Sequence, residues 1–88
     1  MKLKGTFTIR EVAGEIIAIP VGQTALELNG MIVLNPVSRV IWEKLEKGAD
    51  KEQILDALTE NFEVERQVAA EDLREILDEL SRQGMLEK

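Results

Sequence analysis

Carboxylates are the side chains of this chain with the clearest potential for chemistry, and they are densest between residues 71 and 79. At helical spacing they would share one surface, where paired carboxylates can bind a divalent cation. The alternative is a solvated helix face, in which Arg74 and Arg82 offset the negative charge. The spacing from Asp78 to Arg82 suits a weak pair along a helix and favours this alternative. The carboxylates concerned are Glu71, Asp72, Glu75, Asp78 and Glu79.

Other catalytic chemistry has few residues to build on. The 88 residues include no histidine and no cysteine, which removes the usual general base, the usual zinc ligand and any thiolate site. Ser38 and Ser81 have no histidine to activate them as nucleophiles. The sequence also has no glycine-rich phosphate loop. We therefore expect a protein that is not an enzyme and has no metal and no cofactor.

The length and net charge of the chain limit the kinds of molecule that it can bind. A chain of 88 residues forms one domain, here residues 1–88. The formal net charge is -6, and residues 61–83 carry seven acidic against three basic side chains. This works against nucleic-acid binding, because positive charge dominates affinity for phosphate backbones. No apolar run approaches the roughly 20 residues of a membrane span, and no signal core is present, so we expect a cytoplasmic protein without membrane contact.

The first part of the chain has the pattern of β-strands. Residues 7–10 alternate between apolar and polar, and the alternation breaks at Glu11 and Val12, which suggests a bulge. Ala13 and Gly14 suit a tight turn into a second strand over residues 15–20. The Asn-Gly pair at residues 29–30 predicts a type I′ hairpin turn, with a short arm over 25–28 before it and a third strand over 31–34 after it.

The rest of the chain has the pattern of three helices. Asn35 and Pro36 form a start signal for the first helix, which Gly48 ends. Asp50 begins the second with a capping box, and the third runs from about residue 66 to residue 83. Trp42 widens the apolar stripe of the first helix, so we expect it in the core rather than as a ligand-stacking surface. The order predicts an α+β, winged helix-turn-helix-like fold: a three-stranded antiparallel sheet followed by three helices.

The helix-turn-helix makes a winged-helix DNA-binding regulator the alternative function. A recognition helix needs lysine and arginine along one face. The second helix instead sets Lys51 against Glu52, Asp56 and Glu60, and the third is acidic overall. The charge pattern therefore disfavours the DNA-binding alternative, which a gel shift at low salt would test.

The strand over residues 31–34 allows two interpretations. It is either an internal strand that is paired on both sides, or an edge strand that lies beside the third helix. It is apolar on both faces and lacks the lysine, proline or bulge that usually protects an exposed edge, which favours the second. An extended guest peptide could then add to it by main-chain hydrogen bonds. A second copy of the chain could fill the same edge, so a monomer and a weak homodimer both remain open.

Several segments resemble the family of coenzyme PQQ synthesis protein D. Residues 34–58 contain Leu-Asn-Pro, then Ile-Trp-Glu, then Gln-Ile-Leu at spacings that look like this family. Residues 10–15 (REVAGE), 20–22 (PVG) and 28–34 (LNGMIVL) look like its stand-alone peptide-modification chaperones. Phe62, Val64, Asp72 and the final Gly-Met-Leu at 84–86 also fit, so the resemblance covers nearly the whole chain.

The resemblance implies a recognition element for ribosomally made, post-translationally modified peptides, with three strands followed by three helices. Such a protein binds the leader segment of a precursor peptide and presents the core to a modifying enzyme, often a radical SAM protein. The leader would lie as an added strand on the third strand, beside the third helix. Arg66 and Arg74 would then meet acidic leader residues. The binding residues implied are Met31, Ile32, Val33 and Leu34 on the strand, and Arg66, Ala70, Leu73, Arg74 and Leu77 on the helix.

Overall fold

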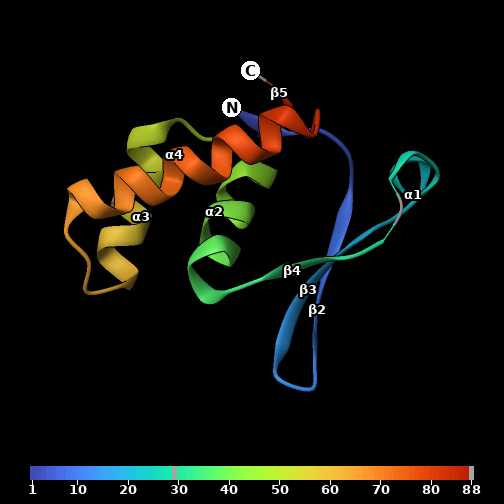
Figure 1. Cartoon of the computed structure of the whole chain (residues 1–88), viewed down its shortest axis with the longest axis horizontal. Helices are drawn as coiled ribbons and strands as arrows, with labels where there is room; N and C mark the ends of the chain where they lie inside the picture. Colours follow the sequence, from blue (N-terminus) through green and yellow to red (C-terminus); the bar gives the residue numbers. More distant parts are fainter. Residues whose placement is uncertain (29, 88) are drawn as a thin grey trace.

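The computed structural model of the chain describes residues 1–28 and 30–87. Its main sheet is antiparallel with the strand order β2–β3–β4, so the expected three-stranded sheet is confirmed (Figure 1). Ile17 of the central strand lies opposite Arg10 on one side and Val33 on the other. The strands are β2 (Phe7–Val12), β3 (Glu15–Pro20) and β4 (Ile32–Leu34).

The hairpin of β2 and β3 differs from the expectation in one detail. Pairing is regular through Glu11 and up to Val12, which lies opposite Glu15, so the bulge predicted there is wrong. Figure 1 shows the turn of the hairpin beyond the helices, and Glu11 and Val12 are both exposed, so burial does not enforce an alternating pattern there. Ala13 and Gly14 turn the chain with φ values of 52° and 82°, as a tight two-residue hairpin turn requires.

The segment expected as a short strand arm is a helix instead, α1 (Gln23–Glu27). Thr24 is buried, and its hydroxyl oxygen accepts a hydrogen bond from the backbone N–H of Thr6 at 2.8 Å. That bond ties α1 to the chain that leads into β2. The turn predicted at residues 29–30 lies in part outside the described residues, because Asn29 is not among them.

The three helices follow the expected boundaries closely. The Asn35 side chain accepts the backbone N–H of Ser38 at 2.8 Å and caps α2, and Asp50 caps α3 through a reciprocal capping box. The last helix ends in a Schellman turn, in which the Met85 N–H donates to the Leu80 carbonyl. The helices are α2 (Pro36–Lys47), α3 (Lys51–Asn61) and α4 (Arg66–Arg82).

One apolar core joins the sheet to these helices. Trp42 is 3% exposed, so its expected place in the core is confirmed. Two short strands that no pattern predicted, β1 (Lys2–Leu3) and β5 (Leu86–Glu87), pair beside the core where the two termini meet (Figure 1). Among the described residues, no helix has both the length and the apolar character needed to cross a membrane. The core includes Phe7, Ile16, Ala18, Leu34, Ile41, Leu45, Ile54, Leu58, Leu73, Leu77 and Met85.

Candidate functional site

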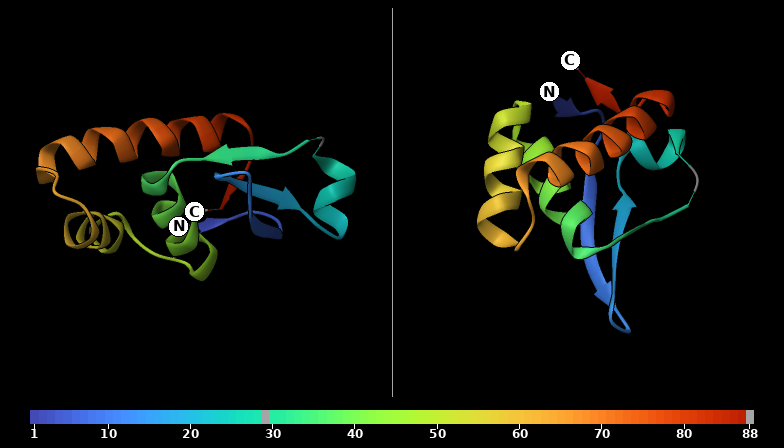
Figure 2. Two further views of the ribbon diagram at one scale, coloured as in Figure 1. Left: turned by 90° about the horizontal axis from the view of Figure 1, so that it is seen from below. Right: turned by 60° about the vertical axis from the view of Figure 1, so that its left-hand side comes forward.

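A groove of about 370 Å³ lies between β4 and α4. In the left view of Figure 2, both elements run along the upper side of the molecule, with α2 beneath them. The strand forms one wall, α4 forms the other, and α2 provides the floor. The lining residues are Met31, Ile32, Val33, Leu34, Ser38, Ile41, Trp42, Ile76, Glu79, Leu80 and Gln83.

The strand wall of the groove is an open sheet edge. β4 pairs with β3 on one side, and no described strand pairs with it on the other. Leu34 faces the core, whereas Met31 and Val33 are 62% and 64% exposed. β2 forms the opposite edge of the sheet, but none of its residues lines the groove. β4 therefore combines free main-chain hydrogen-bonding groups with an adjoining apolar space, the combination that strand addition needs.

The floor of the groove consists of Ile41 and Trp42 from α2. Both side chains are buried, and the Trp42 ring meets Phe7 edge to face, with a centroid distance of 5.0 Å and an interplanar angle of 82°. The indole N–H of Trp42 has no hydrogen-bond acceptor among the described residues. An unpaired buried N–H is uncommon in proteins, and here it belongs to a residue that lines a groove.

The helical wall carries Ile76 and Leu80 as its apolar part and Glu79 and Gln83 as its polar part. The Gln83 side-chain amide donates to a Glu79 carboxylate oxygen at 2.7 Å, and Arg82 forms an ion pair with the same carboxylate. The hydrogen bond from Gln83, together with Arg82, holds the pKa of Glu79 below its ordinary value. Glu79 is therefore ionised at neutral pH at the rim of the groove.

A smaller hollow of about 340 Å³ continues the groove along α4. It shares Ile76 with the groove, and Asn35 and Val37 at the start of α2 form its other side. Asp72 and Glu75 of α4 complete the lining. The lining residues that α4 contributes to the two spaces run from Asp72 to Leu80, or about two turns of one flank of the helix.

The sequence-predicted residues divide between this site and another part of the molecule. The four residues predicted as the strand, Met31 to Leu34, all line the groove, although Met31 directly precedes β4 and is not part of it. None of the five predicted helix residues lines it: Leu73 and Leu77 are buried in the core, and Arg66 pairs with α3. The Arg66 guanidinium lies 2.9 Å from an Asp56 carboxylate oxygen and 2.6 Å from one of Glu52, and these bonds raise its pKa. By helical spacing, Ala70 and Arg74 continue the flank of Arg66.

The groove residues that the sequence did not indicate come from α4 and α2. The apolar stripe of α4 has two borders, and the spacing of residues does not say which border faces the sheet. The packing of α4 on α3 decides it, by turning Arg66 toward α3 and Ile76 toward β4. A weak signal was present, because Ile76 and Leu80 lie at helical spacing within the stripe. The residues missed are Ser38, Ile41, Trp42, Ile76, Glu79, Leu80 and Gln83.

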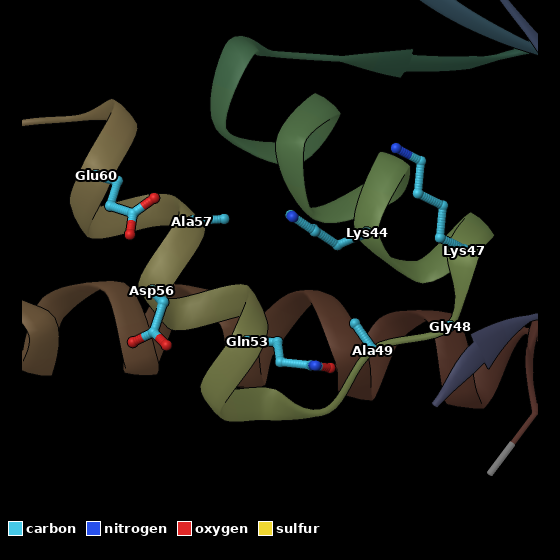
Figure 3. A pocket seen from close by; sticks show the side chains of 8 residues that line it. All are labelled: Lys44, Lys47, Gly48, Ala49, Gln53, Asp56, Ala57 and Glu60. Carbon is cyan, nitrogen blue, oxygen red and sulfur yellow. The ribbon is translucent and has the colours of Figure 1, made fainter.

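A second hollow, of about 390 Å³, lies between α2 and α3 on another part of the surface (Figure 3). Lys44 and Lys47 come from α2, while Asp56 and Glu60 come from α3, so the charges of its two sides balance. No strand borders it, and it offers neither an open edge nor an apolar floor. In the part of the chain that the structure describes, no three acidic side chains come together as metal ligands.

Comparison with known proteins found a solved structure with a similar fold and a matching protein family. A solved structure of TbiB1 in complex with the TbiA(beta) leader peptide is similar to this chain, with a TM-score of 0.72 and 26% sequence identity. The similarity covers 99% of this chain and 95% of TbiB1. The comparison with curated proteins gave no match.

The family model for coenzyme PQQ synthesis protein D (PqqD) matches residues 22–86, well over half of the chain. The matched span contains β4 and all three long helices, and so every residue of the groove. The resemblance inferred from the sequence is thereby confirmed. The chain belongs to the family of coenzyme PQQ synthesis protein D, whose members are non-catalytic peptide-binding chaperones.

Proposed function

We propose that this chain binds the leader segment of a ribosomally made precursor peptide by adding it as a strand to β4. The observation that carries the proposal is the open edge of β4 beside an apolar groove. The solved relative supports it, because TbiB1 was captured in complex with a leader peptide. In this proposal, the guest pairs with Ile32, Val33 and Leu34 of β4 and with Met31, which directly precedes the strand.

Main-chain hydrogen bonds would provide affinity that depends little on sequence, and the groove would provide selectivity. Every second side chain of an added strand points to the same face. Guest side chains on the groove face would pack on Ile76, Leu80 and the floor formed by α2. Burial of one aliphatic or aromatic side chain contributes about 1.5–3 kcal/mol, so two such anchors account for much of a micromolar affinity.

The helix residues predicted from the sequence take a different part in this proposal. Leu73 and Leu77 anchor α4 on the core, and Arg66 fixes its first turn against α3. They hold the helical wall at its distance from β4 rather than contacting the guest. The guest-facing side of α4 is the flank with Ile76, Glu79, Leu80 and Gln83.

We further propose that the bound leader presents the rest of the precursor to a separate modifying enzyme. This chain has neither histidine nor cysteine and no bound cofactor is expected, so the chemistry would come from the partner. A radical SAM protein is the partner class that the sequence resemblance suggests. The product would be a modified peptide or a quinone cofactor derived from one. Co-purification of a tagged copy with the enzymes encoded beside its gene would test this part.

The binding step has a direct test in the intrinsic fluorescence of the chain. Trp42 is the one tryptophan and lines the groove, so occupancy should change its emission. We expect saturable binding of the leader encoded beside the gene, with a Kd at or below tens of micromolar. A scrambled leader of the same composition is the matched control. Equal signals from leader and scramble, or no binding at about 100 μM, would overturn the proposal.

A further inference from the structure

The charged side chains that line the groove and the hollow that continues it are all acidic. Glu79 lines the groove itself, and Asp72 and Glu75 line the hollow that continues it. Neither space has a lysine or an arginine among its lining residues. The apolar floor is therefore bordered along α4 by three carboxylates, spaced so that they share the flank that faces β4.

The basic residues of α4 offset only part of this negative charge. Arg82 pairs with Glu79 and offsets the charge of that carboxylate, whereas Arg66 is held by carboxylates of α3. Arg74 lies eight residues after Arg66, on the flank that faces α3 rather than β4. Asp72 and Glu75 form no ion pair with any described residue. Both carboxylates are therefore available to a cation that arrives with a guest.

The carboxylates belong to a formed binding site and are not an isolated acidic surface. The groove has an open strand edge on one side and apolar side chains beneath it. Trp42 lines the groove and is 3% exposed, and its buried indole N–H lacks an acceptor among the described residues. A ligand is thus indicated independently of the charges, and the charges specify its chemistry.

We infer that the guest of this groove is a basic amphipathic segment, in which apolar side chains enter the groove and lysine or arginine side chains meet the carboxylates of α4. The inference rests on the proposed function, since it concerns the same guest. It replaces the acidic leader expected from Arg66 and Arg74, because those residues face away from β4. The net charge of -6 would also speed encounter with a cationic peptide at low salt.

A peptide-display selection tests the inference without knowledge of the natural guest. Random 12-residue peptides are selected on the full chain, and peptides that bind a β4 proline variant as tightly as the unsubstituted chain are removed. The variant is whichever of Ile32→Pro and Val33→Pro keeps the native circular dichroism spectrum. The remaining peptides depend on the β4 edge, and their charge composition is compared with that of the starting library.

The possible outcomes of the selection distinguish the inference of a basic guest from the proposed binding at the β4 edge. Enrichment of lysine and arginine with depletion of aspartate and glutamate supports the inference. Edge-dependent peptides without this bias, or with an acidic bias, overturn the inference and leave the proposed function standing. Failure to obtain any edge-dependent peptide overturns the proposed function, and the inference with it.

Charge-reversal variants of this chain, measured with one selected peptide as ligand, test which carboxylates contact the peptide. Glu75→Lys should weaken binding about 3- to 10-fold at about 50 mM salt, since an exposed attraction becomes a repulsion. Glu63→Lys is the matched control, because it makes the same change of net charge at an exposed position between α3 and α4 that lines neither space. An equal effect of the two reversals would show a long-range field instead of contact with α4, and would contradict the inference.

Discussion

Neighbouring proline substitutions in β4 should separate the hydrogen bonds of the fold from those available to a guest. Successive N–H groups of an antiparallel strand point alternately to its two neighbours. β4 has β3 on one side and an open edge on the other, with Ile32 opposite Ala18 and Val33 opposite Ile17. One of Ile32→Pro and Val33→Pro therefore removes a bond within the sheet, and the other removes a donor at the open edge.

One substitution should therefore change the free energy of unfolding, and the other should change the affinity for the leader. The proline that faces β3 should lower the free energy of unfolding by about 1 kcal/mol or more, as measured by urea denaturation. The proline at the open edge should leave unfolding nearly unchanged and weaken leader binding about 2- to 10-fold, because one main-chain hydrogen bond contributes about 0.5–1.5 kcal/mol. Leader affinity is read from the fluorescence of Trp42. If neither folded variant bound the leader more weakly, strand addition at β4 would be refuted.

Other predictions concern the fold and the rim of the groove. Ala13→Asn should stabilise the chain by about 1 kcal/mol in urea denaturation, because Ala13 has a φ of 52° that asparagine tolerates better; a destabilised variant would contradict this reason. Thr24→Val should cost about 1 kcal/mol, since the Thr6 N–H loses its acceptor; unchanged stability would show that water replaces the hydroxyl without loss. Gln83→Ala should raise the pKa of Glu79 toward its ordinary value of 4.5, as followed by NMR titration of the carboxyl carbon. A titration of Glu79 that the substitution leaves unchanged would contradict the role of Gln83. Because the folded-state pKa of Glu79 is lowered, the contribution of its carboxylate to stability is present above about pH 4.5 and is lost as the pH falls through the folded-state pKa.

Features encoded by local chemistry were predictable from the sequence. Asn35 and Asp50 cap helices through their own side chains, and Ala13-Gly14 turns the chain by its own backbone angles. The strand of residues 31–34 was recognisable as an edge because it is apolar on both faces and lacks protective charge. Each of these signals lies within a few residues, so it does not depend on the rest of the fold.

Features that depend on packing between distant segments were not predictable in the same way. Residues 25–28 are mostly apolar and were expected as a strand arm, yet α1 covers residues 23–27, and its Thr24 hydroxyl accepts a hydrogen bond from the distant Thr6 N–H. The flank of α4 that faces β4 is set by the packing of buried side chains such as Leu73 and Leu77 on the core, and Arg66 meets α3 on the other flank. The orientation of α4 places Asp72, Glu75 and Glu79, rather than Arg66 and Arg74, beside the space next to β4, and the proposed basic guest depends on that placement.

Hydrogen exchange on the complex tests strand addition most directly, because the sheet has two edges and only one is proposed to bind. With the leader bound, we predict that backbone amide exchange within Ile32–Leu34 slows by about 10-fold or more, while amides on the opposite edge strand, β2, are unchanged. Amides of β2 serve as the internal control, since general stabilisation by a ligand would slow both strands alike. Protection at β2, or protection in the helices without protection in β4, would contradict strand addition at the groove.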